Sequence, residues 1–151
     1  MQIYYFLYLC PKQTIILAME IENQSVDYRP LILVAEDDDS NFKLIKAIIG
    51  KKCEVQWARN GEEIVSLFLE NRDKADAILM DIKMPVMNGL DATQRIRREG
   101  GTLPIIMQTA YAFSSDRENA MNAGASEVLV KPITLSTLRN CLSSYLPQLV
   151  W

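Results

Sequence analysis

The feature that most constrains the fold is a fivefold alternation of short apolar runs with longer amphipathic stretches, which begins at Leu31. The first run, Leu31–Ala35, is apolar at every position, as expected of a strand that is buried on both faces of a sheet. Strands that alternate with helices require a parallel sheet with helices on both faces. The predicted strands are Leu31–Ala35, Cys53–Trp57, Ala77–Met80, Pro104–Thr109 and Glu127–Val130. The sequence therefore predicts a doubly wound, five-stranded parallel α/β fold.

The amphipathic stretches predict the helices that connect these strands. Apolar residues recur at helical spacing from Phe42 to Ile49, and Ser40 or Asn41 is a suitable N-cap for that helix. A second helix is expected to open at Asn60, followed by helices at about residues 90–97, 114–123 and 135–145.

The absence of histidine excludes several classes of chemistry. Among 151 residues there is no histidine, so Ser-His-Asp catalysis, His-ligated zinc and a phosphohistidine within the chain are ruled out. Cys10, Cys53 and Cys141 form no C-x-x-C pair and suit buried thiols in a reducing compartment. A formal net charge of -3 argues against a dedicated nucleic-acid binder. The chemistry must therefore depend on carboxylates, Lys, Ser or Thr, or a bound ion.

Residues 1–30 precede the alternating pattern and are interpreted as an N-terminal extension and linker. Ile3–Leu9 and Ile15–Met19 are apolar runs, each shorter than the roughly 20 residues that span a bilayer. The favoured interpretation is a strand or hairpin that packs on another surface; a membrane or export segment and an artefact of the start site are the alternatives. The polar stretch from Glu20 to Pro30 suits a linker, so the predicted domain covers residues 31–147.

Polar residues stand at the ends of four of the five predicted strands. Glu36 and Asp37 follow the first strand and Asp81 follows the third, while Thr109 ends the fourth and Lys131 follows the fifth. Functional groups of such sheets lie beyond the carboxyl ends of the strands, at the switch point in strand order. We therefore expect these five side chains to lie at one edge of the sheet.

A carboxylate cluster at this edge would suit phosphoryl transfer. Like charges that lie close together repel, so the acids either hold protons or bind a cation, and oxygen ligands suit Mg²⁺ or Mn²⁺. In such a transfer, the cation and Lys131 would neutralise the negative charge of the phosphoryl group, and Thr109 would orient that group. Asp81 is then the candidate nucleophile. The donor must then be another molecule, because the chain has no histidine. Asp38 and Asp39 are instead expected in a solvated turn or at a helix N-cap.

The segments at these strand ends resemble the receiver domain of two-component response regulators over about Leu31 to Leu146. The acid pair and the segment after Asp81 are most similar to receivers of bacterial hybrid sensor histidine kinases. The resemblance implies the flavodoxin-like strand order 2-1-3-4-5. The matching segments are LILVAEDDDSN at residues 31–41, ILMDIKMPVMNG at residues 78–89, Thr109-Ala110 and Lys131-Pro132.

The resemblance also implies roles for individual residues. Asp81 is the implied phosphoacceptor, and Thr109 and Lys131 are implied contacts of the phosphoryl group. The implied ligands of Mg²⁺ (or Mn²⁺) are Glu36, Asp37, Asp81 and the backbone carbonyl of Lys83. Phosphorylation is expected to change the face formed by residues 114–123, 127–130 and 135–145.

The implied function is that of a phosphorelay receiver, a signalling switch with weak self-phosphorylation and dephosphorylation. The implied partner is a histidine kinase or a histidine phosphotransfer protein, with a homodimer through the switching face as a further expectation. Direct contact with nucleic acid or membrane is not expected. The expected location is the cytoplasm, either as a stand-alone regulator or as a module of a hybrid kinase tethered to a membrane.

Two residues depart from the family pattern, and two others occupy positions that tune it. The family usually has an aromatic residue where this chain has Val128, so coupling of Thr109 to the switching face is altered or uses another side chain such as Tyr111. Gln108 replaces an apolar residue, which the sequence does not explain. Lys83 and Tyr111 occupy positions that tune phosphate loss in this family, and we expect the bulky Tyr111 to shield the site from water.

Three other interpretations remain open from the sequence. A receiver could serve only as a docking scaffold that is never phosphorylated. A Mg²⁺-dependent phosphatase of the haloacid-dehalogenase type could use Asp37-Asp38-Asp39, but it would not need Asp81 and Lys131 at their spacing. A flavodoxin-like cofactor binder would need a Gly/Ser/Thr-rich phosphate loop after the first strand, where this chain has acids.

Overall fold

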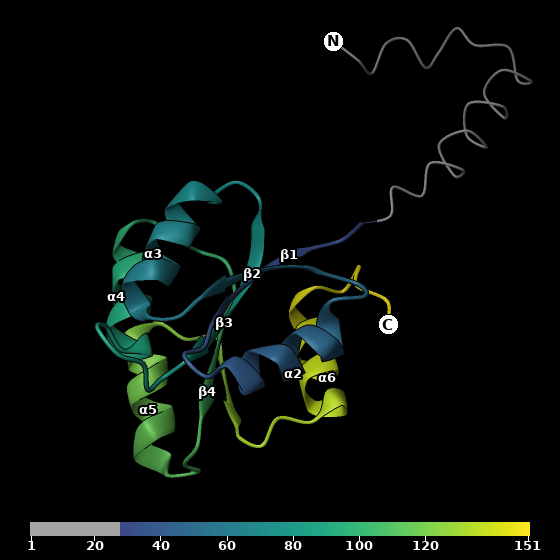
Figure 1. Ribbon diagram of the computed structural model, residues 1–151. Helices are drawn as coiled ribbons and strands as arrows, with labels where there is room; N and C mark the ends of the chain where they lie inside the picture. Colours follow the sequence, from purple (N-terminus) through teal and green to yellow (C-terminus); the bar gives the residue numbers. More distant parts are fainter. Residues whose placement is uncertain (1–27) are drawn as a thin grey trace, which may run out of the picture.

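The computed structural model describes residues 28–151, in which a five-stranded sheet carries helices on both faces (Figure 1). The strand order is β2-β1-β3-β4-β5, and every neighbouring pair is parallel. The predicted fold class and strand order are therefore confirmed. The strands are β1 (Leu31–Ala35), β2 (Glu54–Ala58), β3 (Ala75–Asp81), β4 (Ile105–Thr109) and β5 (Glu127–Val130). The helices are α2 (Asp39–Ile49), α3 (Gly61–Glu70), α4 (Gly89–Arg98), α5 (Ser114–Ala123) and α6 (Leu135–Tyr145).

Each face of the sheet has its own hydrophobic core. Helices α3, α4 and α5 cover one face, and α2 and α6 cover the other (Figure 1). Side chains alternate along β3, so Ile78 belongs to the first core and Leu79 to the second. The same alternation directs Asp81, at the end of β3, to the side that α2 and α6 cover.

The expectation that Asp38 or Asp39 stands in a turn or at a helix N-cap is confirmed for Asp38, whereas Ser40 and Asn41 are wrong as caps of the first described helix. Asp38, not Ser40 or Asn41, is the N-cap of α2, and its side chain accepts a hydrogen bond from the backbone N–H of Asn41 at 2.8 Å. The helix begins sooner than the apolar pattern indicates because only three residues separate it from β1. Asn60 caps α3 as the sequence indicated, and its side chain accepts hydrogen bonds from the N–H groups of Glu62 and Glu63.

Strand boundaries differ slightly from the predicted ones. β3 extends to Ala75 and Asp81 because its ends continue the pairing with β1 and β4 beyond the apolar run. β4 starts at Ile105, after Pro104, which has no N–H for the ladder but accepts a hydrogen bond from Ile78. The predicted bounds of β5, α5 and α6 agree with the structure.

The predicted N-terminal extension lies mostly outside the described residues, so its strand and linker remain predictions. The last part of it packs on the domain, where the Tyr28 hydroxyl donates to Asp76 at 2.7 Å and Arg29 donates to the carbonyl of Gly50 at 3.0 Å. Between residues 28 and 151, no helix has the length and apolarity needed to cross a membrane.

Candidate functional site

Three carboxylates meet at the carboxyl ends of the two central strands. Glu36 directly follows β1, Asp37 comes next, and Asp81 is the last residue of β3. One oxygen from each of the three lies within 4.8 Å of the others. Glu36 and Asp81 are buried, with 0% and 7% of their surface exposed, whereas Asp37 is exposed. The predicted carboxylate cluster is confirmed, and its set of oxygen donors fits a hard divalent cation.

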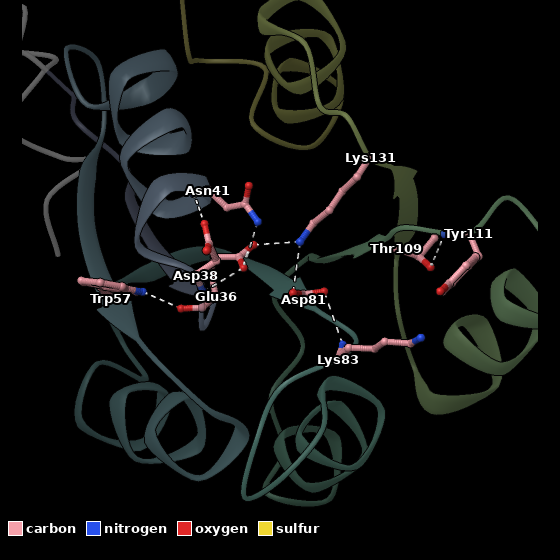
Figure 2. Close-up of polar contacts among 9 residues, drawn as sticks. All are labelled: Glu36, Asp38, Asn41, Trp57, Asp81, Lys83, Thr109, Tyr111 and Lys131. Carbon is pink, nitrogen blue, oxygen red and sulfur yellow. Dashed lines mark hydrogen bonds and ion pairs between the residues drawn. The ribbon is translucent and has the colours of Figure 1, made fainter.

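Lys131, which follows the edge strand β5, reaches toward the central strands and into this cluster (Figure 2). Its Nζ lies 2.9 Å from Glu36 Oε2 and 3.1 Å from Asp81 Oδ2. Burial raises the pKa of the Glu36 carboxyl, and the hydrogen bond from Lys131 only partly opposes this. Burial would lower the pKa of Lys131, but the Glu36 and Asp81 carboxylates outweigh it and raise that pKa. The lysine therefore stays an ammonium beside Asp81.

The second oxygen of Glu36 is held by the start of α2. Glu36 Oε1 accepts the backbone N–H of Asp38 at 3.2 Å and the side-chain amide of Asn41 at 3.4 Å. Asn41 was considered only as a cap from the sequence, and its contact with Glu36 was missed. The one available signal was its position five residues after Glu36, on the first turn of a helix that starts at the site.

The segment after Asp81 folds back against it. The backbone N–H of Lys83 donates to Asp81 Oδ1 at 3.3 Å. Gly89, the first residue of α4, donates its N–H to the carbonyl of Ile82 at 2.9 Å. A Cβ at Gly89 would collide with the carbonyl oxygen of Asp81, so glycine permits α4 to start directly beneath the site.

Thr109 and Tyr111 lie on the side of Asp81 away from Glu36 (Figure 2). Thr109 is buried at the end of β4, and its hydroxyl oxygen accepts the backbone N–H of Tyr111 at 3.1 Å. The ammonium of Lys83 lies 4.4 Å from the centre of the Tyr111 ring, which is a cation–π contact. The loops that follow β3 and β4 therefore touch at the rim of the site.

The two residues that depart from the family pattern, Val128 and Gln108, have different surroundings. Val128 is buried and lines a cavity of about 100 Å³ together with Thr109, Tyr111 and Phe113, where a larger side chain would take up space. Gln108 is buried beside Asp81 in the sheet register, and its side-chain nitrogen has no hydrogen-bond partner within residues 28–151. Nothing in the structure explains the choice of glutamine there.

Comparison with known sequences decides the family. The family described as "Response regulator receiver domain" matches residues 32–143. The chain belongs to the response regulator receiver family. The matched range includes the three carboxylates of the cluster, Thr109 and Lys131.

Two curated relatives are hybrid or sensor kinases. The receiver chain is 37% identical over 121 residues to hybrid signal transduction histidine kinase I of Dictyostelium discoideum, covering 75% of this chain and 7% of that protein. It is 33% identical over 118 residues to the sensor histidine kinase RcsC of Escherichia coli, covering 76% of this chain and 12% of RcsC. The chain thus spans only a small part of these relatives. They come from an amoeba and a bacterium, so the resemblance extends beyond the bacterial kinases named from the sequence.

Solved receiver structures share the fold. The receiver domain of a sensor histidine kinase from Pseudomonas aeruginosa PAO1, solved with magnesium coordinated in its active-site cleft, has a TM-score of 0.72 and 33% identity, covering 80% of this chain and 99% of that one. The receiver of Ssk1 from Saccharomyces cerevisiae, solved with the histidine phosphotransfer protein Ypd1, has a TM-score of 0.73 and 25% identity, covering 81% and 92%.

Proposed function

We propose that this receiver accepts a phosphoryl group on Asp81 from a histidine kinase or a histidine phosphotransfer protein, in a reaction that depends on Mg²⁺ or Mn²⁺. The observation that carries the proposal is the meeting of three carboxylates within 4.8 Å beside the ammonium of Lys131. Glu36, Asp37, Asp81 and the backbone carbonyl of Lys83 would hold the cation. The Pseudomonas receiver, which coordinates magnesium, supports this choice of ion.

Each residue contributes a separate part of the reaction. Asp81 is an anionic nucleophile, so its attack on the phosphorus atom needs no general base. Lys131, now shared between Glu36 and Asp81, can pair with an oxygen of the transferred group. When bound, the divalent cation supplies further neutralisation of charge on the phosphoryl oxygens. The histidine that gives up the phosphoryl group must come from the partner, because this chain has none.

The proposed switch begins at Thr109. Phosphorylation adds a charge of about -1.5 to -2 at Asp81. If the hydroxyl of Thr109 turns toward a phosphoryl oxygen, it gives up the bond that it now accepts from the N–H of Tyr111. The loop after β4 is then released, and the face of α5, β5 and α6 can change shape, with dimerisation through that face as one outcome.

The relatives support a choice of partner and of context for this receiver. The Ypd1–Ssk1 structure supports a histidine phosphotransfer protein as the donor. The hybrid kinase relatives support a role as one module of a longer cytoplasmic or membrane-tethered kinase. The activity of the receiver itself would be limited to weak self-phosphorylation from small donors and slow loss of phosphate.

The test is a mass measurement after incubation with acetyl phosphate and Mg²⁺. We expect the mass to rise by one phosphoryl group, and we expect no rise with Asp81→Asn or after removal of the metal with EDTA. Asp73→Asn is the matched control, because Asp73 is exposed and takes no part in the cluster. A wild-type chain that never gains mass but still binds a phosphotransfer protein would be a docking scaffold. Sustained turnover of a chromogenic phosphate ester would indicate a phosphatase.

A further inference from the structure

Trp57, on the edge strand β2, makes a hydrogen bond at the site that the proposed reaction does not use. Its indole N–H donates to the carbonyl oxygen of Glu36 at 2.8 Å (Figure 2). On its other side, Glu36 donates its own N–H to the carbonyl of Ala58 at 3.0 Å. The carbonyl that Trp57 holds belongs to the peptide group joining Glu36 to Asp37. Because a peptide group is planar, fixing its oxygen also fixes the direction in which the chain continues to Asp37.

The indole is itself held in place by contacts with Phe42 and Arg59. Its ring stacks on Phe42 of α2, with ring centres 4.1 Å apart and planes 2° apart. The guanidinium of Arg59 lies 4.0 Å from the Trp57 ring centre. Arg59 also pairs with Asp39, the first residue of α2, at 3.3 Å. These contacts make the indole a rigid donor beside residues 36–38.

Asp37 depends on this backbone contact more than the other two acids do. The side chains of Glu36 and Asp81 are each bonded by Lys131 and by backbone N–H groups. Asp37 is exposed, and nothing in the described part of the chain donates a hydrogen bond to its carboxylate. Its direction is therefore set by the peptide group that precedes it.

We propose that Trp57 is a positioning residue for the divalent cation, which acts by holding the Glu36–Asp37 peptide group so that Asp37 faces the other two carboxylates. This inference rests on the proposed function, because it concerns the affinity of the same site. Without the indole donor the peptide group can rotate, and Asp37 spends less of its time in the ligand position. The cation is then bound more weakly, although the fold remains.

The test compares two tryptophan variants. Trp57→Phe keeps an aromatic ring between Phe42 and Arg59 but removes the N–H donor. We expect its Kd for Mg²⁺, measured by titration calorimetry, to rise about tenfold or more, as is typical when a group that orients metal ligands is lost. The melting temperature without metal should stay close to the wild-type value. Trp151→Phe is the control, since it also removes an indole donor, which bonds Ser143 at 2.8 Å, and its Kd should not change.

The outcomes separate this inference from the proposed function. If the wild type does not bind Mg²⁺, the proposed function fails. If the wild type binds and Trp57→Phe binds equally well, the positioning role is overturned, whether or not the variant melts earlier. If Trp57→Phe does not fold, the Trp151→Phe protein decides, because Trp57 is then its one tryptophan. Its indole N–H resonance should shift with Mg²⁺ at the calorimetric midpoint, and an unchanged resonance overturns the inference.

Discussion

At the scale of single residues, Lys83 and Tyr111 contact each other beside Asp81 (Figure 2). Their cation–π contact of 4.4 Å joins the two loops that flank the site. Tyr111 is about half exposed, at 46%, so its ring is in contact with solvent at the rim of the site. We expect Tyr111→Ala to shorten the lifetime of the phosphorylated protein several-fold, because water gains access to the phosphoryl group.

The lifetime is measured by following the loss of the added mass after the phosphodonor is removed. Tyr28→Ala is the matched control, because Tyr28 is exposed to a similar degree, at 40%, and bonds to Asp76, five residues before the phosphoacceptor at the opposite end of β3. An unchanged lifetime of Tyr111→Ala would refute the shielding role.

Cys53 gives a prediction about pH. Burial raises the pKa of its thiol from the ordinary value of 9.0 to about 11. The folded protein therefore holds this proton more tightly than the unfolded chain does. The resulting stabilisation is fully present below pH 9 and is lost as the pH rises through 11. Between pH 8 and pH 11, the wild type should lose more unfolding free energy than Cys53→Ala in urea titrations; parallel losses would contradict this.

At the scale of elements, side chains at the N-caps decide where helices begin. Asp38, Asn60, Asn88 and Thr134 each accept a backbone N–H of the helix that follows. Helix α5 starts after Phe113 with no side-chain cap. The cap of α3 was evident in the sequence. For α2, the sequence offered a turn or an N-cap as the role of Asp38, because nothing distinguished it as the cap within the four consecutive acids at residues 36–39.

Loss of the α3 cap should measurably destabilise the domain. Asn60 accepts hydrogen bonds from the N–H groups of Glu62 at 3.0 Å and Glu63 at 2.9 Å. Asn60→Ala is expected to lower the free energy of unfolding by about 1 kcal/mol, as measured by urea denaturation. Asn140→Ala, at an exposed position inside α6, should not lower it. Equal effects of the two variants would exclude capping as the cause.

At the scale of the whole molecule, Arg97 joins α4 to the two turns that lead into β4 and β5. Its Nε donates to the carbonyl of Gly124 at 2.9 Å, and its Nη1 donates to the carbonyls of Gly101 at 2.9 Å and Leu103 at 2.8 Å. The sequence placed Arg97 on a helix but indicated none of these partners, since they come from two separate turns.

Removing the guanidinium leaves those three carbonyls without their donor. Arg97→Ala should lower the free energy of unfolding by about 2–4 kcal/mol, because unpaired polar groups are costly when half-buried. Arg97→Lys should recover only part of this, since an ammonium lacks the planar fork that reaches separate acceptors. Arg98→Ala, on the exposed side of the same helix, is the control in the same denaturation assay. Full recovery by lysine would mean that charge alone matters.

The sequence by itself determined the α/β class, the strands and the edge at which the polar residues lie, because these depend on local apolar periodicity and on the common direction of parallel strands. Only the tertiary structure decided which atoms meet there. Lys131 contacts Glu36 across 95 residues, and Trp57 contacts the carbonyl of Glu36 across 21. Such contacts depend on sheet register and on helix packing against both faces, which no local pattern encodes.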